Sequence, residues 1–265
     1  MERRPDDAYL SESSKGNSGG MTVRGSLQYR ELARFYDPLT DWKDYRSEAR
    51  RVEAIAAQYG NPGRTTWLDV ACGTGRHLEF LHRNHPCAGV DGSREMLRIA
   101  RRRLPHIPLV QADMRSFQLP NRFDVVSCLF SAIGHLRTKR DVRSALANFE
   151  AHLKPGGVVV VEPWIERRAF RSGLVHLRAH EDPSITVARM AYSSRQGDHS
   201  VIQWHYLIGE PGRGVRYREV TDVGLLLARP ELLAFMRATG LRARFVARGL
   251  MPGRGLLVGV KPRKA

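Results

Sequence analysis

The sequence is poor in cysteine. Only Cys72, Cys87 and Cys128 occur in 265 residues, and none of them stands in a CxxC pair. So few thiols exclude a disulfide scaffold and a zinc ribbon, and we expect no metal site. No apolar run approaches the roughly 20 residues of a membrane helix, and the N-terminus lacks the pattern of a secretory signal. These absences favour a cytoplasmic protein that has no membrane partner.

Lysine is scarce as well, since 6 lysines stand beside 37 arginines. Together they outnumber the 27 acidic residues and give a net charge of +16. Such a charge can signal nucleic-acid binding. However, the arginines are spread from Arg3 to Arg263, whereas a nucleic-acid face more often shows basic runs with interleaved aromatics. We therefore expect an arginine-rich surface and no nucleic-acid partner.

The chain divides into four parts by composition and pattern. Residues 1–26 are polar and rich in Ser and Gly, which predicts a disordered tail. Residues 27–163 begin with helical spacing and continue as short apolar strands alternating with helices. This alternation predicts a mainly parallel sheet covered on both faces. Residues 164–228 predict an antiparallel β insertion, and residues 229–265 predict a helix and two strands that complete the main sheet.

Three strands are expected in the insertion, at residues 185–194, 200–208 and 214–227. Two stretches separate them, Arg195-Gln196-Gly197-Asp198 and Glu210-Pro211-Gly212-Arg213-Gly214, and both have turn composition. The following helix should span residues 230–239, and the closing strands should span residues 241–248 and 255–261. The fold class is thus α/β with an inserted antiparallel sheet.

Residues suited to ligand binding lie at the ends of three successive predicted strands. The segment Leu68-Asp69-Val70-Ala71-Cys72-Gly73-Thr74-Gly75 joins a strand to a helix, and its glycines allow a tight turn close to a ligand. It matches neither the GxGxxG fingerprint nor the phosphate-binding P-loop. Asp91 ends the second strand, and Ala112-Asp113-Met114 follows the third. Because open α/β sheets bind ligands at the carboxyl ends of their strands, these residues predict one binding site.

These motifs, together with Leu153-Lys154-Pro155-Gly156-Gly157, resemble those of class I S-adenosylmethionine-dependent methyltransferases. The resemblance implies a Rossmann-like seven-stranded sheet with one antiparallel strand near the C-terminus. It also implies S-adenosyl-L-methionine as the cofactor, with the glycine loop at the methionine part, Asp91 at the ribose, and Asp113-Met114 at the adenine. The cofactor residues that it implies are Tyr36, Tyr45, Asp69, Ala71, Gly73, Thr74, Gly75, Asp91, Gly92, Asp113, Met114 and Leu129.

Further stretches resemble the N-methyltransferases of nucleotide-linked aminosugars, which make the dimethylamino groups of desosamine- and mycaminose-type sugars of macrolide antibiotics. They are Phe130-Ser131-Ala132-Ile133-Gly134-His135-Leu136, Val161-Glu162-Pro163-Trp164, Gly253-Arg254-Gly255-Leu256, Trp204-His205-Tyr206 and Lys43-Asp44-Tyr45. The resemblance implies a thymidine-diphosphate (TDP)-linked amino-deoxysugar as substrate, methylated twice on one nitrogen. It also implies a homodimer that the extra antiparallel strands help to build.

The acceptor residues follow from chemistry and from this resemblance. His135 follows the fourth strand and could take the proton of an amine that must attack through its lone pair. The family also orients the amine with a tyrosine, for which Tyr29 is the best positional match. Arg254 suits a pyrophosphate, because a guanidinium binds such oxygens bidentately. The other predicted substrate residues are Phe130, Ser131, Glu162, Trp164 and Tyr206.

Other functions stay open at this point. The enzyme could methylate another small amine, such as an amino acid, or an RNA, and a cofactor-binding module without catalysis is a further class. The tetrapeptide Asn/Asp-Pro-Pro-Tyr/Phe of many base methyltransferases is missing after the fourth strand, where Phe130-Ser131-Ala132-Ile133 stands. Ile165 and Leu250-Met251-Pro252 depart from the family pattern. These departures leave open which aminosugar is bound and whether its nitrogen is at C3 or C4.

Overall fold

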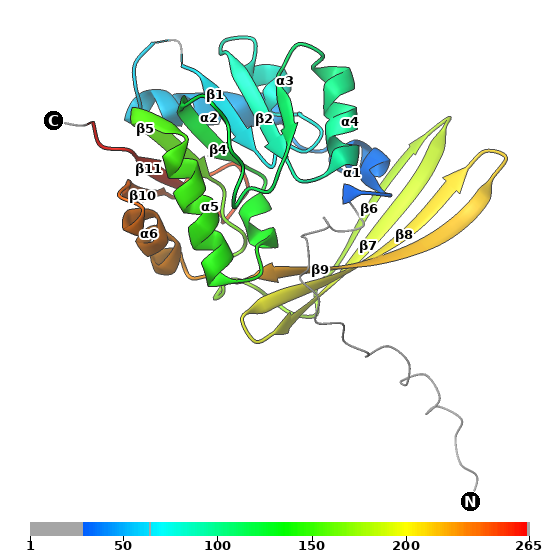
Figure 1. Ribbon diagram of the computed structural model, residues 1–265. Helices are drawn as coiled ribbons and strands as arrows, with labels where there is room; N and C mark the ends of the chain where they lie inside the picture. The colour runs from blue at the N-terminus through cyan, green and yellow to red at the C-terminus, as the bar shows by residue number, and fades with distance from the viewer. Residues whose placement is uncertain (1–28, 64, 264–265) are drawn as a thin grey trace, which may run out of the picture.

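The computed structural model describes residues 29–63 and 65–263, and it places them in two sheets (Figure 1). The predicted tail at residues 1–26 lies outside the described residues. The larger sheet has seven strands in the order β10-β11-β5-β4-β1-β2-β3. A separate four-stranded sheet follows the order β6-β7-β8-β9. No helix among the described residues has both the length and the apolar character that a membrane crossing requires.

The seven-stranded sheet is parallel except for β11, which runs antiparallel to both neighbours, β5 and β10. The predicted class I methyltransferase topology, with its one antiparallel strand, is therefore confirmed. Alternate residues of each strand point to opposite faces of the sheet. The strands are β1 (Trp67–Val70), β2 (Cys87–Asp91), β3 (Leu109–Gln111), β4 (Phe123–Cys128), β5 (Leu153–Val161), β10 (Arg242–Val246) and β11 (Leu256–Val260).

Helices cover both faces of this sheet (Figure 1). The helices α5 (Lys139–Ala151) and α6 (Arg229–Ala238) pack against one face, with Leu68 and Val126 in their shared core. The opposite face carries α2 (Tyr45–Tyr59), α3 (Leu78–Leu81) and α4 (Arg94–Arg103), around a core that includes Trp67 and Val160. Three of these helices begin after a polar residue whose side chain accepts a hydrogen bond from a backbone N–H group of the first turn. This hydrogen bond stabilises the start of the helix. These N-cap residues are Asp44, Ser93 and Thr138.

The second sheet is an antiparallel meander in residues 175–225. The strands β7 (Ile185–Gln196), β8 (His199–Glu210) and β9 (Gly214–Leu225) occur where the sequence predicts them. A fourth strand, β6 (Val175–Asp182), was not predicted. Its sequence does alternate apolar and polar residues, but the alternation is inverted: Val175 and Leu177 are exposed to solvent, while His176 and Arg178 line a cavity.

The N-terminal segment connects the two sheets. It contains the short helices η2 (Ala33–Phe35) and α1 (Tyr36–Leu39). Leu32, Phe35 and Leu39 pack in one buried cluster with residues of the inner face of the second sheet. The same segment reaches the main sheet, because the Ser93 hydroxyl at the start of α4 donates to the backbone carbonyl of Tyr29. The inner face of the second sheet is thereby held opposite the carboxyl ends of the parallel strands.

Candidate active site

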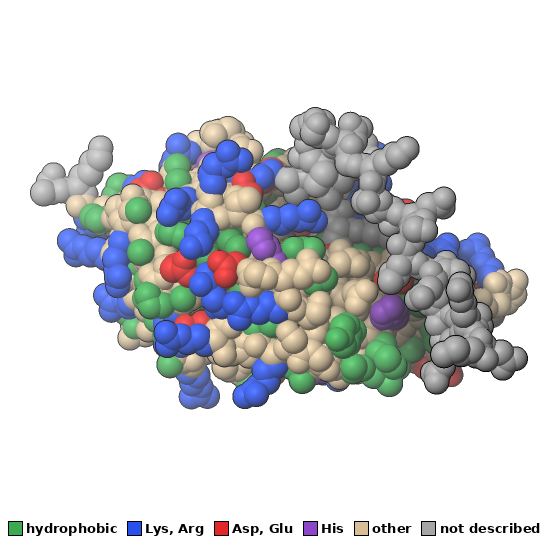
Figure 2. Space-filling view, turned by 90° about the horizontal axis from the view of Figure 1, so that it is seen from below, with side chains coloured by type: hydrophobic (Ala, Val, Ile, Leu, Met, Phe, Trp, Pro, Cys, Tyr) green, Lys and Arg blue, Asp and Glu red, His purple; other side chains and the backbone are tan. Residues whose placement is uncertain are grey.

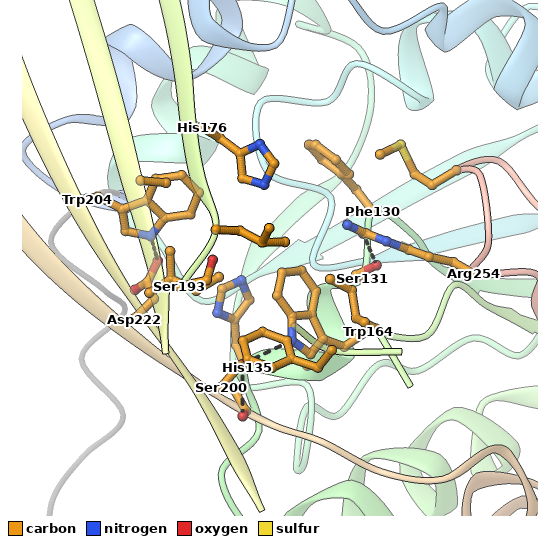
Figure 3. Close-up of a pocket in the computed structure, with 18 of the residues that line it drawn as sticks. Phe130, Ser131, His135, Trp164, His176, Ser193, Ser200, Trp204, Asp222 and Arg254 are labelled. Atoms are coloured by element: carbon orange, nitrogen blue, oxygen red, sulfur yellow. Dashed lines mark hydrogen bonds between the residues drawn. The ribbon is translucent and has the colours of Figure 1, made fainter. Parts of the chain in front are cut away.

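Two cavities open at the carboxyl edge of the main sheet. The larger measures about 380 Å³ and lies between this edge and the inner face of the second sheet (Figure 3). The smaller measures about 30 Å³ and lies beside the loop that follows β1. Tyr36 and Phe130 line both cavities. The two binding spaces are therefore neighbours with a common wall.

The wall of the small cavity is formed by the turn after β1. Ala71, Gly73 and Gly75 all have positive φ, at 58°, 56° and 79°, so this turn departs sharply from a helical or extended path. The backbone N–H of Gly73 donates to the Asp91 carboxylate at 2.8 Å. The other Asp91 oxygen accepts from the N–H of Ser93 at 2.7 Å. Asp91 thus ties the end of β2 to the glycine loop.

A buried carboxylate lies below this turn. Burial raises the pKa of Asp69 to about 6, against the opposing effects of His77 and of the Ser127 hydroxyl. That hydroxyl donates to Asp69 Oδ1 at 2.7 Å and itself accepts from the indole of Trp67. Seven of the predicted cofactor residues line the small cavity: Tyr36, Tyr45, Asp69, Ala71, Gly73, Thr74 and Leu129.

The remaining predicted cofactor residues line neither cavity. Asp113 forms a fork with Arg115, whose Nη2 lies 2.6 Å from Asp113 Oδ2, and Arg115 also reaches Asp141. Met114 packs against the core beneath α5, and Gly92 is exposed after β2. Their contacts with adenine and ribose stay predictions, as does that of Asp91.

An ionic clasp joins the N-terminal helices to the glycine loop. The Asp37 carboxylate accepts from the Thr74 hydroxyl and from Arg103 Nη2, both at 2.6 Å. Arg103 also donates to the backbone carbonyl of Thr74. Asp37 directly follows Tyr36, so these bonds hold the Tyr36 ring over the small cavity.

A sharp turn at the end of β4 forms the wall between the cavities. Phe130 and Ser131 have φ of 50° and 59°, values that are costly for residues with side chains and that often mark functional sites. The Ser131 hydroxyl donates to the carbonyl of Pro163 at 2.7 Å and accepts from Arg254 Nη1 at 2.6 Å. The guanidinium of Arg254 also lies over the Trp164 ring, 4.9 Å from its centroid. The turn after β4, the segment after β5 and the loop before β11 thus meet at Ser131 (Figure 3).

His135 and Tyr29 meet in the wall of the large cavity. The Tyr29 hydroxyl lies 2.8 Å from His135 Nε2, and the two rings pack edge to face. Burial lowers the pKa of His135, while the charge of Asp222 opposes the shift. This direction favours the neutral form of the ring. Tyr29 also packs at 6.0 Å from Tyr36, which places the pair close to the wall shared by both cavities.

Two predicted substrate residues do not line the large cavity. Glu162 is fully buried behind it, where Oε1 accepts from the backbone N–H of Met251 and burial raises the pKa of the carboxyl. Tyr206 is buried in the cluster between the second sheet and the N-terminal helices. The cavity itself contains Phe130, Ser131, Trp164 and Arg254.

Several residues on the inner face of the second sheet line the large cavity although none of them was predicted as a substrate contact. Trp204 and Asp222 line the large cavity, and the Trp204 indole donates to Asp222 Oδ2 at 2.9 Å. Arg178 and Arg189 line it too. Because alternate residues of a strand point to the same face, the sequence indicates which of these residues share a face of the sheet. It does not indicate that this face lines a cavity.

Comparison with known proteins agrees with this geometry. Residues 68–157 match a family described as a methyltransferase domain. The chain is 41% identical over 219 residues to dTDP-3-amino-3,4,6-trideoxy-alpha-D-glucopyranose N,N-dimethyltransferase of Streptomyces venezuelae, covering 82% of this chain and 92% of the relative. It is 34% identical to dTDP-4-amino-2,3,4,6-tetradeoxy-D-glucose N,N-dimethyltransferase of Saccharopolyspora spinosa, covering 83% and 87%.

Two solved structures are similar over most of the chain. The crystal structure of DesVI from Streptomyces venezuelae has a TM-score of 0.82 and 39% identity, covering 87% of this chain and 98% of that one. CalS10, an amino pentose methyltransferase from Micromonospora echinaspora solved with S-adenosylmethionine bound, has a TM-score of 0.77 and 35% identity, covering 87% and 96%. The fold and site define a class I S-adenosylmethionine-dependent N-methyltransferase. The chain belongs to the family of dTDP-aminosugar N,N-dimethyltransferases.

Proposed function

We propose that this enzyme transfers two methyl groups in succession to the amino group of a TDP-linked amino-deoxysugar, as a step in antibiotic biosynthesis. The observation that carries the proposal is the shared wall at Tyr36 and Phe130. The methionine end of a cofactor bound at the small cavity and an acceptor in the large one would face each other there. Such positioning contributes much of the rate in a displacement reaction.

The residues around the small cavity fit S-adenosylmethionine. Tyr36, Tyr45 and Phe130 offer aromatic surfaces, which attract a cation. The Asp69 carboxyl and the backbone of the glycine loop are polar groups suited to the amino and carboxylate ends of a methionine. When bound, S-adenosylmethionine supplies a methyl group on a sulfonium. The Asp37 clasp keeps the Tyr36 ring over this space.

His135 and Tyr29 are proposed to handle the proton of the amine. An alkyl ammonium is largely protonated at neutral pH and lacks the lone pair that must attack. A neutral imidazole can accept such a proton, and the lowered pKa keeps His135 in that form. The Tyr29 hydroxyl, 2.8 Å from Nε2, fixes the orientation of the ring and reaches the same space.

We place the acceptor nitrogen at C3 of the sugar. Two relatives named as acting on 3-amino sugars are 41% and 40% identical to this chain, whereas the relative named for a 4-amino sugar is 34% identical. Phe130, Ser131, Trp164 and Arg254 are the proposed substrate contacts from the main-sheet side. We also propose a cytoplasmic location.

The function is tested by incubating the protein with S-adenosylmethionine and a matched panel of TDP-sugars, followed by mass spectrometry. The panel contains the 3-amino sugar, the 4-amino sugar and a sugar with hydroxyl groups at both positions. We expect the 3-amino sugar to gain one and then two methyl groups fastest, and the hydroxyl sugar to gain none. No gain with either amino sugar would overturn the proposal.

A homodimer through the outer face of the second sheet is also proposed. Val175, Leu177, Met190, Leu207 and Tyr217 are all exposed on this face. Figure 2 shows apolar side chains grouped at the end of the molecule where this sheet lies. Contiguous apolar patches of this kind mark protein–protein interfaces.

Leu207→Lys should convert a dimer to a monomer in sedimentation analysis. Val110→Lys, at an exposed apolar residue of β3, is the matched control and should not change the mass; a wild-type monomer would refute the dimer.

A further inference from the structure

Two arginines lie directly opposite each other on the inner face of the second sheet. Arg178 on β6 and Arg189 on β7 are paired residues in the strand register, and both line the large cavity. Like charges directly opposite on neighbouring strands are destabilising. An anion bound in the cavity beside the two guanidinium groups would therefore relieve the repulsion between them.

No acidic side chain in the described part of the chain forms an ion pair with either of these arginines. Among residues 29–63 and 65–263, no carboxylate lies within 4.0 Å of either guanidinium. The neighbouring acids Asp41 and Asp182 both pair with His180 instead. Arg189 Nε is buried and has no hydrogen-bond partner among the described residues. Arg189 does interact with the Tyr206 hydroxyl, but its Nε donor is left for a ligand to satisfy.

Tryptophans hold both guanidinium groups in place. The guanidinium carbon of Arg178 lies 5.2 Å from the centroid of the Trp42 ring, and that of Arg189 lies 4.4 Å from the centroid of Trp204. A guanidinium stacked on an aromatic face keeps its N–H edge available for planar, bidentate contacts. The single acid among the described lining residues, Asp222, accepts from the Trp204 indole and so helps to fix this arrangement.

We propose that Arg178 and Arg189 form the diphosphate subsite of the large cavity, an inference that rests on the proposed nucleotide-sugar substrate. Directly opposed residues have Cβ atoms roughly 4.5–5.5 Å apart, which lets two guanidinium forks contact two adjacent phosphates. Arg254 lies on the other side of the cavity from Trp204 (Figure 3). The diphosphate is thereby held from both halves of the molecule, with the sugar directed toward Tyr29 and His135.

The test measures dissociation constants for TDP and thymidine monophosphate by calorimetry, without a turnover assay. The variants are Arg178→Gln, Arg189→Gln and the double substitution. Arg195→Gln is the matched control, because Arg195 lies on the same strand but does not line the cavity. Each cavity variant should weaken TDP binding about 10- to 100-fold, with a smaller loss for the monophosphate. The control and the affinity for S-adenosylmethionine should stay at the wild-type value.

Two results would overturn this subsite. One is TDP affinity that is unchanged in both single variants, and the other is an equal loss for TDP and the monophosphate. If the double variant does not fold, the single variants decide the question. A wild-type protein that binds no TDP would remove the proposed substrate class and the subsite together. Unchanged variants of a TDP-binding wild type would remove the subsite alone.

Discussion

The two cavities are built in different ways. The small one is formed mainly by the turn after β1, and it is completed by Tyr36 and Tyr45 from the N-terminal helices and by Leu129 and Phe130 after β4. The large one is formed by side chains from opposite sides, from the turn after β4 and from the inner face of the second sheet. The first depends on local backbone conformation. The second depends on how two sheets are held against each other.

Some residues line both cavities, whereas others line only one of them. Tyr36 and Phe130 form the common wall, and His135 and Tyr29 lie beside it on the acceptor side. Substitutions in the small cavity should change affinity for the cofactor. Substitutions beside the common wall should change the chemical step and leave both affinities close to wild type.

The largest effect is expected for His135→Ala. Removing a general base commonly slows the reaction by about 10²- to 10³-fold, and kcat should fall by this amount. The affinity for S-adenosylmethionine should be unchanged, because His135 does not line the small cavity. Steady-state kinetics and calorimetry check the two parts. His82→Ala, at an exposed histidine, is the matched control; a loss confined to cofactor affinity would refute the assigned role.

A smaller but still large effect is expected for Asp91→Ala. This substitution removes an acceptor of two backbone N–H bonds and releases the glycine loop from β2. Charged hydrogen bonds contribute about 1.5–3 kcal/mol each, and a loss equivalent to one of them should weaken S-adenosylmethionine binding roughly 10- to 150-fold. TDP affinity should not change. Equal losses for both ligands would show that the cavities are not independent.

A moderate effect is expected for Asp37→Asn. The variant keeps a hydrogen bond to Thr74 but loses its ion pair with Arg103. Because such partly exposed pairs contribute about 1 kcal/mol, affinity for S-adenosylmethionine should fall roughly fivefold. Asp41→Asn, on the same segment but mostly exposed, is the control that should change nothing. A larger loss in the control than in Asp37→Asn would rule out the clasp.

The smallest effect is expected for Asp222→Asn, and it concerns pH. The charge of Asp222 stabilises protonated His135, so its removal should lower the pKa of His135 further. The base is active when neutral, and the acid limb of the kcat/KM profile should therefore move to lower pH. The asparagine can still accept from Trp204, which keeps the packing. A shift to higher pH would contradict this electrostatic relation.

The sequence predicted the residues of the small cavity better than those of the large cavity. The glycine loop and Asp69 were predicted because strand, turn and helix signals are local, and they do line the small cavity. Tyr206 was predicted beside the substrate from the resemblance of its stretch to the family, but it packs against the N-terminal helices and does not line the large cavity.

The inner face of the second sheet was missed for a physical reason. Arg178 and Arg189 become partners only through strand register, and Trp204 meets Asp222 across two strands. Register depends on turns and on which face is buried, and neither is visible in the composition of one strand. The strand β6 was missed because its polar residues face the cavity and its apolar residues face outward.

The most direct test of the shared wall is a crystal structure with S-adenosylhomocysteine and the TDP-linked 3-amino sugar both bound. We predict that the amino nitrogen lies beside Tyr29 and His135 and faces the sulfur across the gap between Tyr36 and Phe130. The diphosphate should lie between Arg254 and the pair of Arg178 and Arg189. A nucleotide sugar bound outside the large cavity, or one whose nitrogen points away from the common wall, would contradict this arrangement.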